Sequence, residues 1–360
     1  AAIRADGRDF ATGRFVYEHI GANRYSLGYL GTAVQGPLYD AYVHGVDGKF
    51  TSATGKWIAE ALMIASDRAD ERGNAALIDV QYARDSRIQH RVSFDWFDED
   101  VNFNDLGFLQ RNDYTGGQYN LMYANPNTTG KLTDIRGTVI VNGKVNQSEG
   151  QLVDGGIFWR NSMVFPGRNT LRTGLGFMPA AYDDRDSRGN GAYRTESRRW
   201  AELLLATDAS QRASWSFVLG AQQENLGGWT SLVGAGVTLR PVGSMVIELD
   251  LKYRDRDGWI VYQGGRDFGR YHADELTPAI KFNWFFAAGH QLGLTLQWVG
   301  VKADGDGYYR VPEGDGDPPA HELRFHGESA HHAGALPLGD RAAHRSLPCL
   351  QPRQYPAQSG

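Results

Sequence analysis

The chain has 360 residues, of which 41% are hydrophobic, and its formal net charge of −5 is spread over interspersed acidic and basic residues, which excludes a basic stripe for nucleic acid and a polybasic membrane anchor. Cys349 is the only cysteine, so a disulfide framework and a cysteine-ligated metal cluster are both excluded. No apolar run approaches the roughly 20 residues that a spanning helix needs, whereas the strands of a membrane β-barrel need only about 9–11 residues.

The dominant pattern along the chain is strict alternation of apolar and polar residues, which is typical of half-buried β-strands. It occurs, in chain order, in residues 24–35, 90–97, 214–223, 232–240, 245–257, 278–286 and 291–299. In MVIELDLKYRDRD (245–257) the other face is fully charged. Turns containing Gly or Pro separate the runs, so we predict an up-and-down meander of about 14–16 strands before residue 311.

Residues 56–73, KWIAEALMIASDRADERG, do not alternate cleanly and are rich in helix formers. An amphipathic helix is therefore an alternative for this segment. We favour a strand, because the segment lies between two turn signals inside the meander.

The domain organisation follows from where the alternation begins and ends. We predict an N-terminal extension (1–12), a β-barrel (13–311) and a disordered or non-native tail (312–360) that is rich in Pro and His. The first residues, AAIRADGRDF, contain no initiator Met and no signal-peptide pattern. We interpret the chain as a mature protein or a fragment, and whether the barrel is complete at either end stays open.

Alternation alone does not tell which face meets water, because a soluble sandwich and a membrane barrel share the same period. Three features favour the barrel. Residues 245–263 and 275–287 are longer than the ~5–6 residues of a typical soluble strand, aromatic residues gather near strand ends, and dense Val/Ile/Leu packing is scarce. We therefore predict an all-β, up-and-down antiparallel transmembrane β-barrel, with a large soluble β scaffold as the alternative.

A barrel assigns alternate side chains to lipid and to the lumen. The predicted lipid-facing residues are Ile247, Leu249, Leu251, Phe282, Trp284, Leu294 and Leu296. The predicted lumen residues on strands are Arg91, Asp95, Glu248, Asp250, Lys252, Arg254 and Lys281. Such a row can form a selectivity or sugar-binding surface. The alternative, which we favour, is that these charges pair with one another and solvate the interior.

One loop carries a family resemblance. DEDVNFNDLGFLQRNDY (98–114) places Asn102, Phe103, Asn104, Gly107, Phe108, Arg111 and Asp113 much as they stand in the signature of a bacterial outer-membrane family, domain of unknown function 5916. Residues 15–34, 42–50 and 289–305 are similar to other strands of that family, so the resemblance covers about residues 13–311. It implies a barrel in the Gram-negative outer membrane, usually preceded by a domain similar to family 9 carbohydrate-binding modules, but no reaction.

The same loop supplies four further ligand candidates, Asn102, Asn104, Arg111 and Asp113. In the structural alternative, Phe103 and Phe108 plug the loop against the barrel and Arg111 pairs with Asp113 or Asp100. The two interpretations are close, and we lean towards the structural one.

We expect no catalytic residue, no cofactor and no metal site. His321, Glu322 and His326 fail the H-E-x-x-H zinc motif because Phe325 stands where the second His is needed. His90 near Asp95 is the least implausible general base, yet no His lies in a Ser-containing nucleophile motif. Neither a P-loop nor a G-x-G-x-x-G after a strand is present.

The resulting hypothesis is a non-catalytic outer-membrane β-barrel that takes part in uptake or binding of a glycan or other small solute. Its expected partners are the lipid bilayer and the barrel-assembly machinery, with no nucleic acid. A membrane-embedded hydrolase is one alternative. A large soluble β scaffold is the other, and it would bury Leu249, Leu251, Phe282 and Trp284 against protein.

Overall fold

The computed structural model describes residues 2–5, 7–126 and 132–311. Its strands, in chain order, are β1 (Ala2–Ala5), β2 (Arg8–Ile20), β3 (Arg24–Gln35), β4 (Ala41–Thr51), β5 (Trp57–Arg68), β6 (Glu71–Ala83), β7 (Ile88–Phe97), β8 (Tyr114–Asn125), β9 (Asp134–Val145), β10 (Leu152–Val164), β11 (Thr170–Met178), β12 (Ala181–Asp183), β13 (Tyr193–Thr195), β14 (Arg198–Ala206), β15 (Ala213–Gln223), β16 (Trp229–Leu239), β17 (Met245–Gly264), β18 (Asp267–Ala287), β19 (His290–Gln297) and β20 (Gly300–Arg310).

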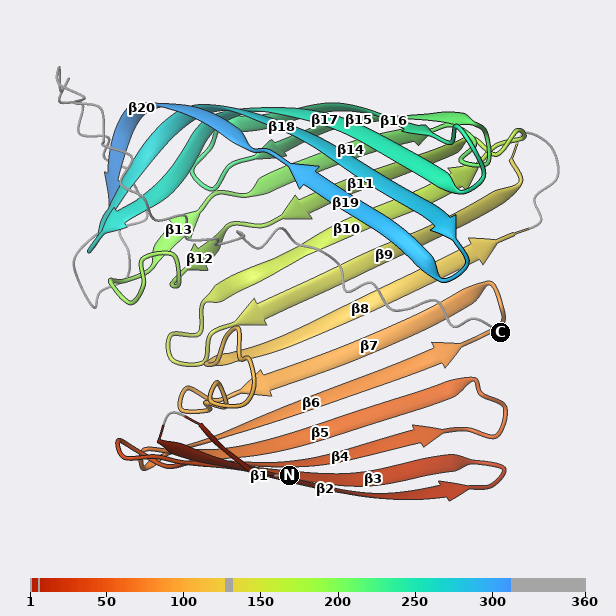
Figure 1. The fold of residues 1–360 in the computed structure, drawn as a ribbon. Coiled ribbons are helices and arrows are strands. Elements are labelled where there is room, and N and C mark those ends of the chain that lie inside the picture. The colour runs from red at the N-terminus through yellow and green to blue at the C-terminus, as the bar shows by residue number, and fades with distance from the viewer. Residues whose placement is uncertain (1, 6, 127–131, 312–360) are drawn as a thin grey trace. The chain divides into compact units, whose positions relative to one another are not determined.

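The strands form one antiparallel meander, in which each strand of the main sheet up to β18 pairs with the next one along the chain (Figure 1). Only β12 and β13 stand apart, as a small two-stranded sheet. The main sheet has 18 strands, more than the 14–16 that the alternation predicted. Part of the difference arises at β18, which pairs with β20 through residues 267–276 and with β19 through residues 279–287, so that two short strands share one long partner.

The ambiguous segment 56–73 is a strand followed by a turn. Residues Trp57–Arg68 form β5, which pairs along its whole length with β4 and β6. Ala69 and Asp70 then take φ angles of 54° and 69°, which makes the tight reversal into β6. Pairing on both sides thus outweighs the helix propensity of the Ala- and Glu-rich sequence.

The N-terminal boundary differs from the expected one. β1 pairs with the beginning of β2, so residues 2–5 and 8–12 belong to the sheet and not to a separate extension. The predicted tail, 312–360, lies outside the described residues.

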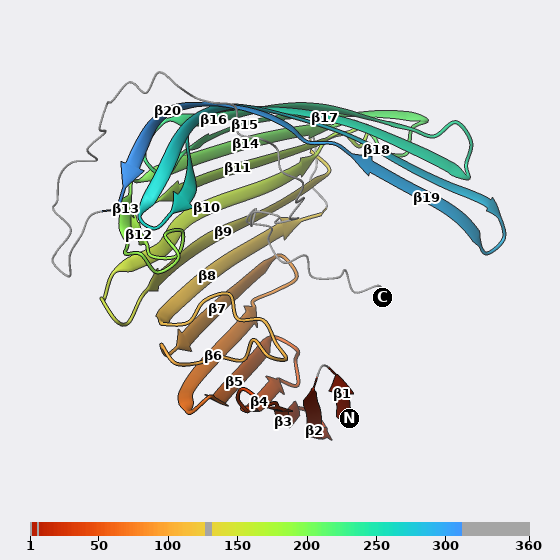
Figure 2. The same ribbon diagram turned by 60° about the vertical axis from the view of Figure 1, so that its left-hand side comes forward.

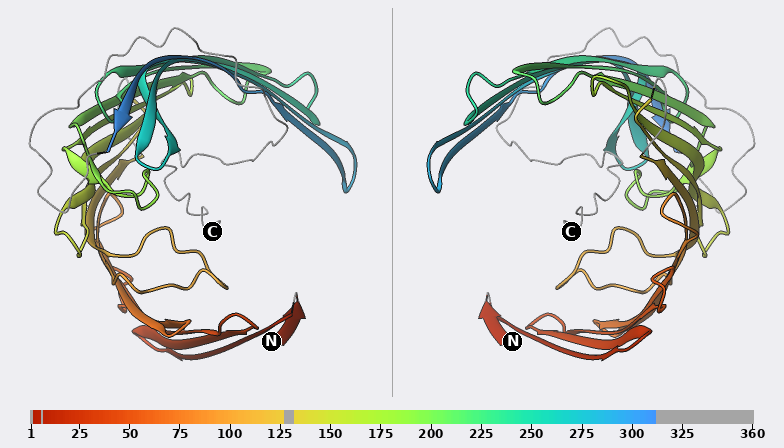
Figure 3. Two further views of the ribbon diagram at one scale, coloured as in Figure 1. Left: turned by 90° about the vertical axis from the view of Figure 1, so that its left-hand side faces the viewer. Right: turned by 90° about the vertical axis from the view of Figure 1, so that its right-hand side faces the viewer.

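The sheet is strongly curved, as the views in Figure 2 and Figure 3 show. Among the described residues, no strand pairing joins β1 or β2 to β19 or β20. The structure is therefore an open antiparallel up-and-down sheet at this seam, where a closed barrel was expected. No helix of the described part of the chain is long and apolar enough to cross a membrane.

One face of the sheet is apolar and exposed; we call it the apolar face. Cross-strand register aligns its side chains into rows, one of which runs through Trp215, Val237, Leu249, Ile280 and Leu296. Leu251 is 50% exposed and Leu296 is 61% exposed. Large exposed apolar patches are rare on soluble monomers and usually mark a surface that contacts a protein partner or a membrane.

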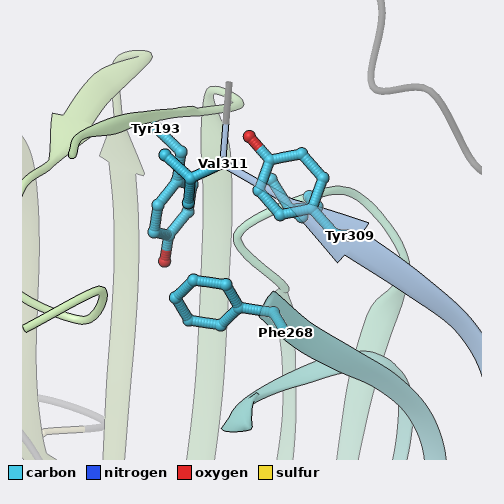
Figure 4. Close-up of a cluster of buried hydrophobic side chains, with 5 residues drawn as sticks. Tyr193, Phe268, Tyr309 and Val311 are labelled. Carbon is cyan, nitrogen blue, oxygen red and sulfur yellow. The ribbon is translucent and has the colours of Figure 1, made fainter. Parts of the chain in front are cut away.

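Buried cores are small and lie at the end of the sheet where the long loops gather. One cluster joins Tyr193, Leu226, Phe268, Tyr309 and Val311 (Figure 4). The other joins Ala75, Phe97, Val101 and Tyr114. Both clusters attach loops to strands, and neither one packs two layers of sheet together.

Candidate functional site

The opposite face of the sheet, which we call the polar face, carries ion pairs between neighbouring strands. Arg91 Nε lies 2.5 Å from Asp79 Oδ2. Arg254 and Arg256 both contact Glu275, at 2.8 and 3.0 Å. The remaining pairs on this face include Arg14–Asp47, Lys49–Glu60 and Lys281–Glu248.

The predicted lumen residues of the strands therefore share the face that the alternation assigned to them. Arg91, Glu248, Arg254 and Lys281 are ion-paired. The other three are placed by strand alternation and register: Asp95 is on β7, Asp250 stands opposite Gly236 and Ala279, and Lys252 stands opposite Gly234 and Thr277. The pairing of charge with charge is the arrangement that we favoured over a ligand surface.

The predicted lipid-facing residues lie together on the apolar face. Ile247, Phe282 and Leu294 form one cross-strand row, and Leu249 and Leu296 lie on the neighbouring row with Ile280. Leu251 and Trp284 continue the pattern on either side. Leu294 is 59% exposed and Trp284 is 37% exposed. These side chains are therefore exposed among the described residues.

The signature loop, residues 98–113, folds onto the polar face. Its Val101 is fully buried against Phe97 and Tyr114, and the backbone nitrogen of Asn102 donates to Ser66 Oγ at 3.0 Å. In Figure 3 this orange-yellow loop lies inside the curve of the sheet, so the polar face is the concave one.

A glycine makes that close approach possible. A Cβ on Gly73 would lie 2.0 Å from the backbone nitrogen of Val101, which is far inside van der Waals contact. The loop backbone thus packs directly on β6 because this position has no side chain.

Three of the four predicted loop residues hold the loop in shape. Asn102 Oδ1 accepts from the Asn104 nitrogen at 3.1 Å, and Asn104 Oδ1 accepts from the Leu109 nitrogen at 2.7 Å. The Asp113 carboxylate accepts from the Gln147 and Ser148 nitrogens, at 3.1 and 3.0 Å. The side-chain oxygens of these three residues are therefore hydrogen-bonded within the protein, which agrees with a structural role.

Arg111 pairs with a residue that sequence reasoning did not identify. Its Nη1 and Nη2 donate to the two carboxylate oxygens of Asp184, at 2.7 and 2.6 Å, and not to Asp113 or Asp100. Arg185 Nη2 donates to the Asn112 carbonyl oxygen at 3.2 Å. We call these four residues, Arg111, Asn112, Asp184 and Arg185, the loop junction. Since 73 residues separate the partners, no local sequence signal could have found the pair.

The Arg111–Asp184 pair of the loop junction is largely shielded from water. The side chains of Arg111 and Asp184 are 15% and 20% exposed. Burial alone would raise the pKa of Asp184, but the hydrogen bonds and the positive charge of Arg111 outweigh it and lower the pKa below 3.8. The bidentate geometry is that of a strong charge-assisted pair.

A second anchor of the signature loop was also missed. Asp105 accepts from Arg68 Nε at 2.9 Å and from the Tyr39 hydroxyl at 2.8 Å. The Arg68 guanidinium lies 4.3 Å from the centre of the Tyr39 ring. The signature loop is thus attached to the sheet at its middle, through Asp105, and to Asp184 between β11 and β14 at its end, through Arg111. Phe108, by contrast, is 83% exposed, so it does not plug the loop against the sheet in the way that the structural alternative proposed.

The second loop, residues 179–197, contains β12 and β13. Its Tyr193 is 1% exposed, and its ring packs at a tilted angle against Phe268 and edge-to-face against Tyr309 (Figure 4). The Tyr193 hydroxyl donates to Asp186 Oδ2 at 3.2 Å. Burial, followed by repulsion from Asp183, raises the pKa of Asp186. This loop is therefore anchored to β18 and β20 at one end and to the signature loop at the other.

The candidate catalytic pair is not assembled. On β7, His90 shares the face of the apolar-face residues Val92 and Phe94, whereas Asp95 shares the face of Arg91. His90 Nδ1 is hydrogen-bonded to the Tyr119 hydroxyl at 2.8 Å. The His90 ring also continues an aromatic row with Tyr82 and Trp57. The candidate general base, His90, and the Asp95 carboxylate therefore lie on opposite faces of the sheet.

Metal ligands were expected to be absent, and the tail residues His321, Glu322 and His326 lie outside the described residues. Within the part of the chain that the structure describes, Asp255, His272 and Asp274 bring one donor atom each to within 4.8 Å of one another. Sequence reasoning missed this group, because the three residues come together only through the register of β17 and β18.

Comparison with known proteins gives one match. A family model described as "Domain of unknown function (DUF5916)" matches residues 26–317. No curated protein and no solved structure matches the chain.

Proposed function

The chain belongs to the DUF5916 family, and from that premise we propose that it is a non-catalytic outer-membrane β-barrel protein that takes part in uptake or binding of a glycan or other small solute. The apolar face would contact lipid, and the polar face with its two loops would line the solute path. The bilayer and the barrel-assembly machinery would be its partners.

The observation that carries the proposal is the division between the two faces of the sheet. Leu249, Leu251 and Trp284 are 38%, 50% and 37% exposed, whereas Arg254 and Glu275 on the other face are paired and 30% and 15% exposed in their side chains. A soluble protein gains its stability by burying apolar area, at about 25 cal/mol per Å². An exposed apolar face of this extent supports contact with hydrocarbon, and it does not support a soluble scaffold.

A membrane environment also requires every backbone group to be paired, because hydrocarbon offers no hydrogen bonds. The seam between the edge strands β2 and β19 would therefore have to be closed in the bilayer. The proposal predicts strand pairing at this seam in the membrane-inserted protein.

The solute role rests on the polar face and its loops. Ion pairs such as Arg91–Asp79 give the concave face a polar lining, and the loop junction holds two loops across it. The hydrolase alternative has no comparable support, since His90 and Asp95 lie on opposite faces.

The environment can be tested with two adjacent positions on β17. In a Cys349→Ser background, Leu251→Cys and Lys252→Cys would each carry one spin label in lipid vesicles. We expect the label at 251 to collide with oxygen in the bilayer and the label at 252 to collide with a water-soluble nickel complex. Equal accessibility of both labels to the nickel complex would contradict the membrane assignment.

The solute role needs a separate experiment. Vesicles containing the protein should swell in neutral oligosaccharides faster than empty vesicles, or the protein should bind such sugars in detergent. If the label at position 251 lies in lipid but neither swelling nor sugar binding is observed, the solute role is contradicted and the barrel proposal is not.

A further inference from the structure

The β17–β18 hairpin carries a cluster of potential metal ligands just beyond the apolar rows. Asp255 and Asp274 are direct cross-strand partners, and His272 lies two residues from Asp274 on the same face. Their donor atoms all lie within 4.8 Å of one another, and His272 Nε2 is 3.7 Å from Asp255 Oδ1. The cluster is separate from the loop junction and from the predicted lumen residues.

The charge arrangement is unfavourable without a cation. Two carboxylates directly opposite each other in an antiparallel pair repel. Asp274 is hydrogen-bonded to the Tyr253 hydroxyl at 2.5 Å, whereas Asp255 Oδ1 is shielded from water and accepts no hydrogen bond among the described residues. Lys302, which stands opposite Asp274, has its ammonium group 3.1 Å from Asp304.

We propose that Asp255, His272 and Asp274 form a binding site for a divalent transition-metal ion of the zinc class. This inference does not depend on the proposed membrane function. An imidazole nitrogen with two carboxylate oxygens is a donor set that such ions accept, whereas Ca²⁺ and Mg²⁺ prefer oxygen donors alone. Water would complete the coordination.

The geometry is close to what the ion needs. Bonds of about 2.0–2.2 Å in a tetrahedral site place neighbouring donor atoms roughly 3.4 Å apart. The observed His272–Asp255 separation of 3.7 Å already lies near that value. His272 and Asp255 are 49% and 44% exposed in their side chains, so small rotations can close the remaining distances.

The test uses the full chain in detergent. Five histidines of the tail could bind metal by themselves, so every variant carries Gln at His321, His326, His331, His332 and His344. Co²⁺ absorption and Zn²⁺ calorimetry then measure binding. We expect one site, with affinity for Zn²⁺ at least about tenfold lower in His272→Ala and in Asp255→Asn.

His290→Ala is the matched control, because His290 is also an exposed histidine on the neighbouring strand and is bonded only to the Ala288 carbonyl oxygen in the described residues. Its affinity should equal that of the background protein. Should His272→Ala misfold, Asp274→Asn and His272→Gln provide the same comparison. Equal Zn²⁺ binding in all variants, or Ca²⁺ binding as tight as Zn²⁺ binding, would overturn the proposal.

Discussion

The two faces of the sheet are built from the same strands but reach stability by different means. On β17, Leu251 is 50% exposed on the apolar face, while Lys252 points to the face that carries ion pairs and the signature loop. Charged groups pair with one another on the polar face, and apolar side chains are left exposed on the other. In a soluble β-sandwich the apolar faces of two sheets cover each other. The division between the two faces of this sheet is instead the one that the proposed membrane environment would require.

The largest expected effect comes from placing a charge on the apolar face. In the proposed membrane environment, Leu251→Arg should destabilise the protein by about 2–4 kcal/mol, because a guanidinium near the middle of the bilayer would lose its hydration. Lys252→Leu, one residue away on the polar face, should cost less. Urea unfolding in lipid vesicles measures both, and equal costs would break the distinction between the faces.

The next effect concerns the loop cover of the polar face. Arg111→Ala leaves the Asp184 carboxylate without its bidentate partner. We expect the free energy of unfolding to fall by about 2–3 kcal/mol. The loss should be smaller than in a fully buried pair, because both side chains retain some exposure. Arg136→Ala is the control, because Arg136 is 66% exposed and its pair with Asp134 should contribute under about 1 kcal/mol. Unfolding and proteolysis of the 98–113 loop both report the change.

The same pair predicts a pH dependence with a definite sign. The pKa of Asp184 is lower in the folded protein than its ordinary value of 3.8. Its stabilisation is therefore fully present above pH 3.8 and is lost as the pH falls through the lowered pKa. In wild type, protection of the loop against an acid protease should persist to below pH 3.8, and Asp184→Asn should remove this dependence. Loss of protection well above pH 3.8 would contradict the assignment.

A smaller effect tests how closely the loop lies on the sheet. Gly73→Ala introduces a Cβ against the Val101 backbone nitrogen, and we expect a cost of about 1–3 kcal/mol as the loop shifts away. Gly143→Ala on β9 is the control, because its Cβ would meet nothing within 4 Å. Thermal unfolding and loop proteolysis should separate the two variants.

The smallest effect belongs to the open part of the polar face. Glu248→Gln removes an ion pair with Lys281 at 3.6 Å, in which the two side chains are 35% and 49% exposed. We expect a change under about 1 kcal/mol that shrinks further in high salt. A larger, salt-independent loss would show that this region is as enclosed as the loop junction.

The sequence by itself determined which side chains share a face. The alternation at residues 245–257 separated Leu249 and Leu251 from Glu248 and Lys252, because the side-chain period of a strand is two whatever its surroundings. The resemblance of residues 98–114 likewise pointed to a family that the match over residues 26–317 bears out.

Only the tertiary structure decided which distant residues meet. The Arg111–Asp184 pair, the Asp105–Arg68 contact and the Asp255–His272–Asp274 group depend on strand register and on how loops fold back over the sheet. A local pattern carries no information about such contacts, since the free energy that selects them comes from burying groups that are far apart along the chain. The separation of His90 and Asp95, by contrast, is local, because residues five apart on one strand point to opposite faces.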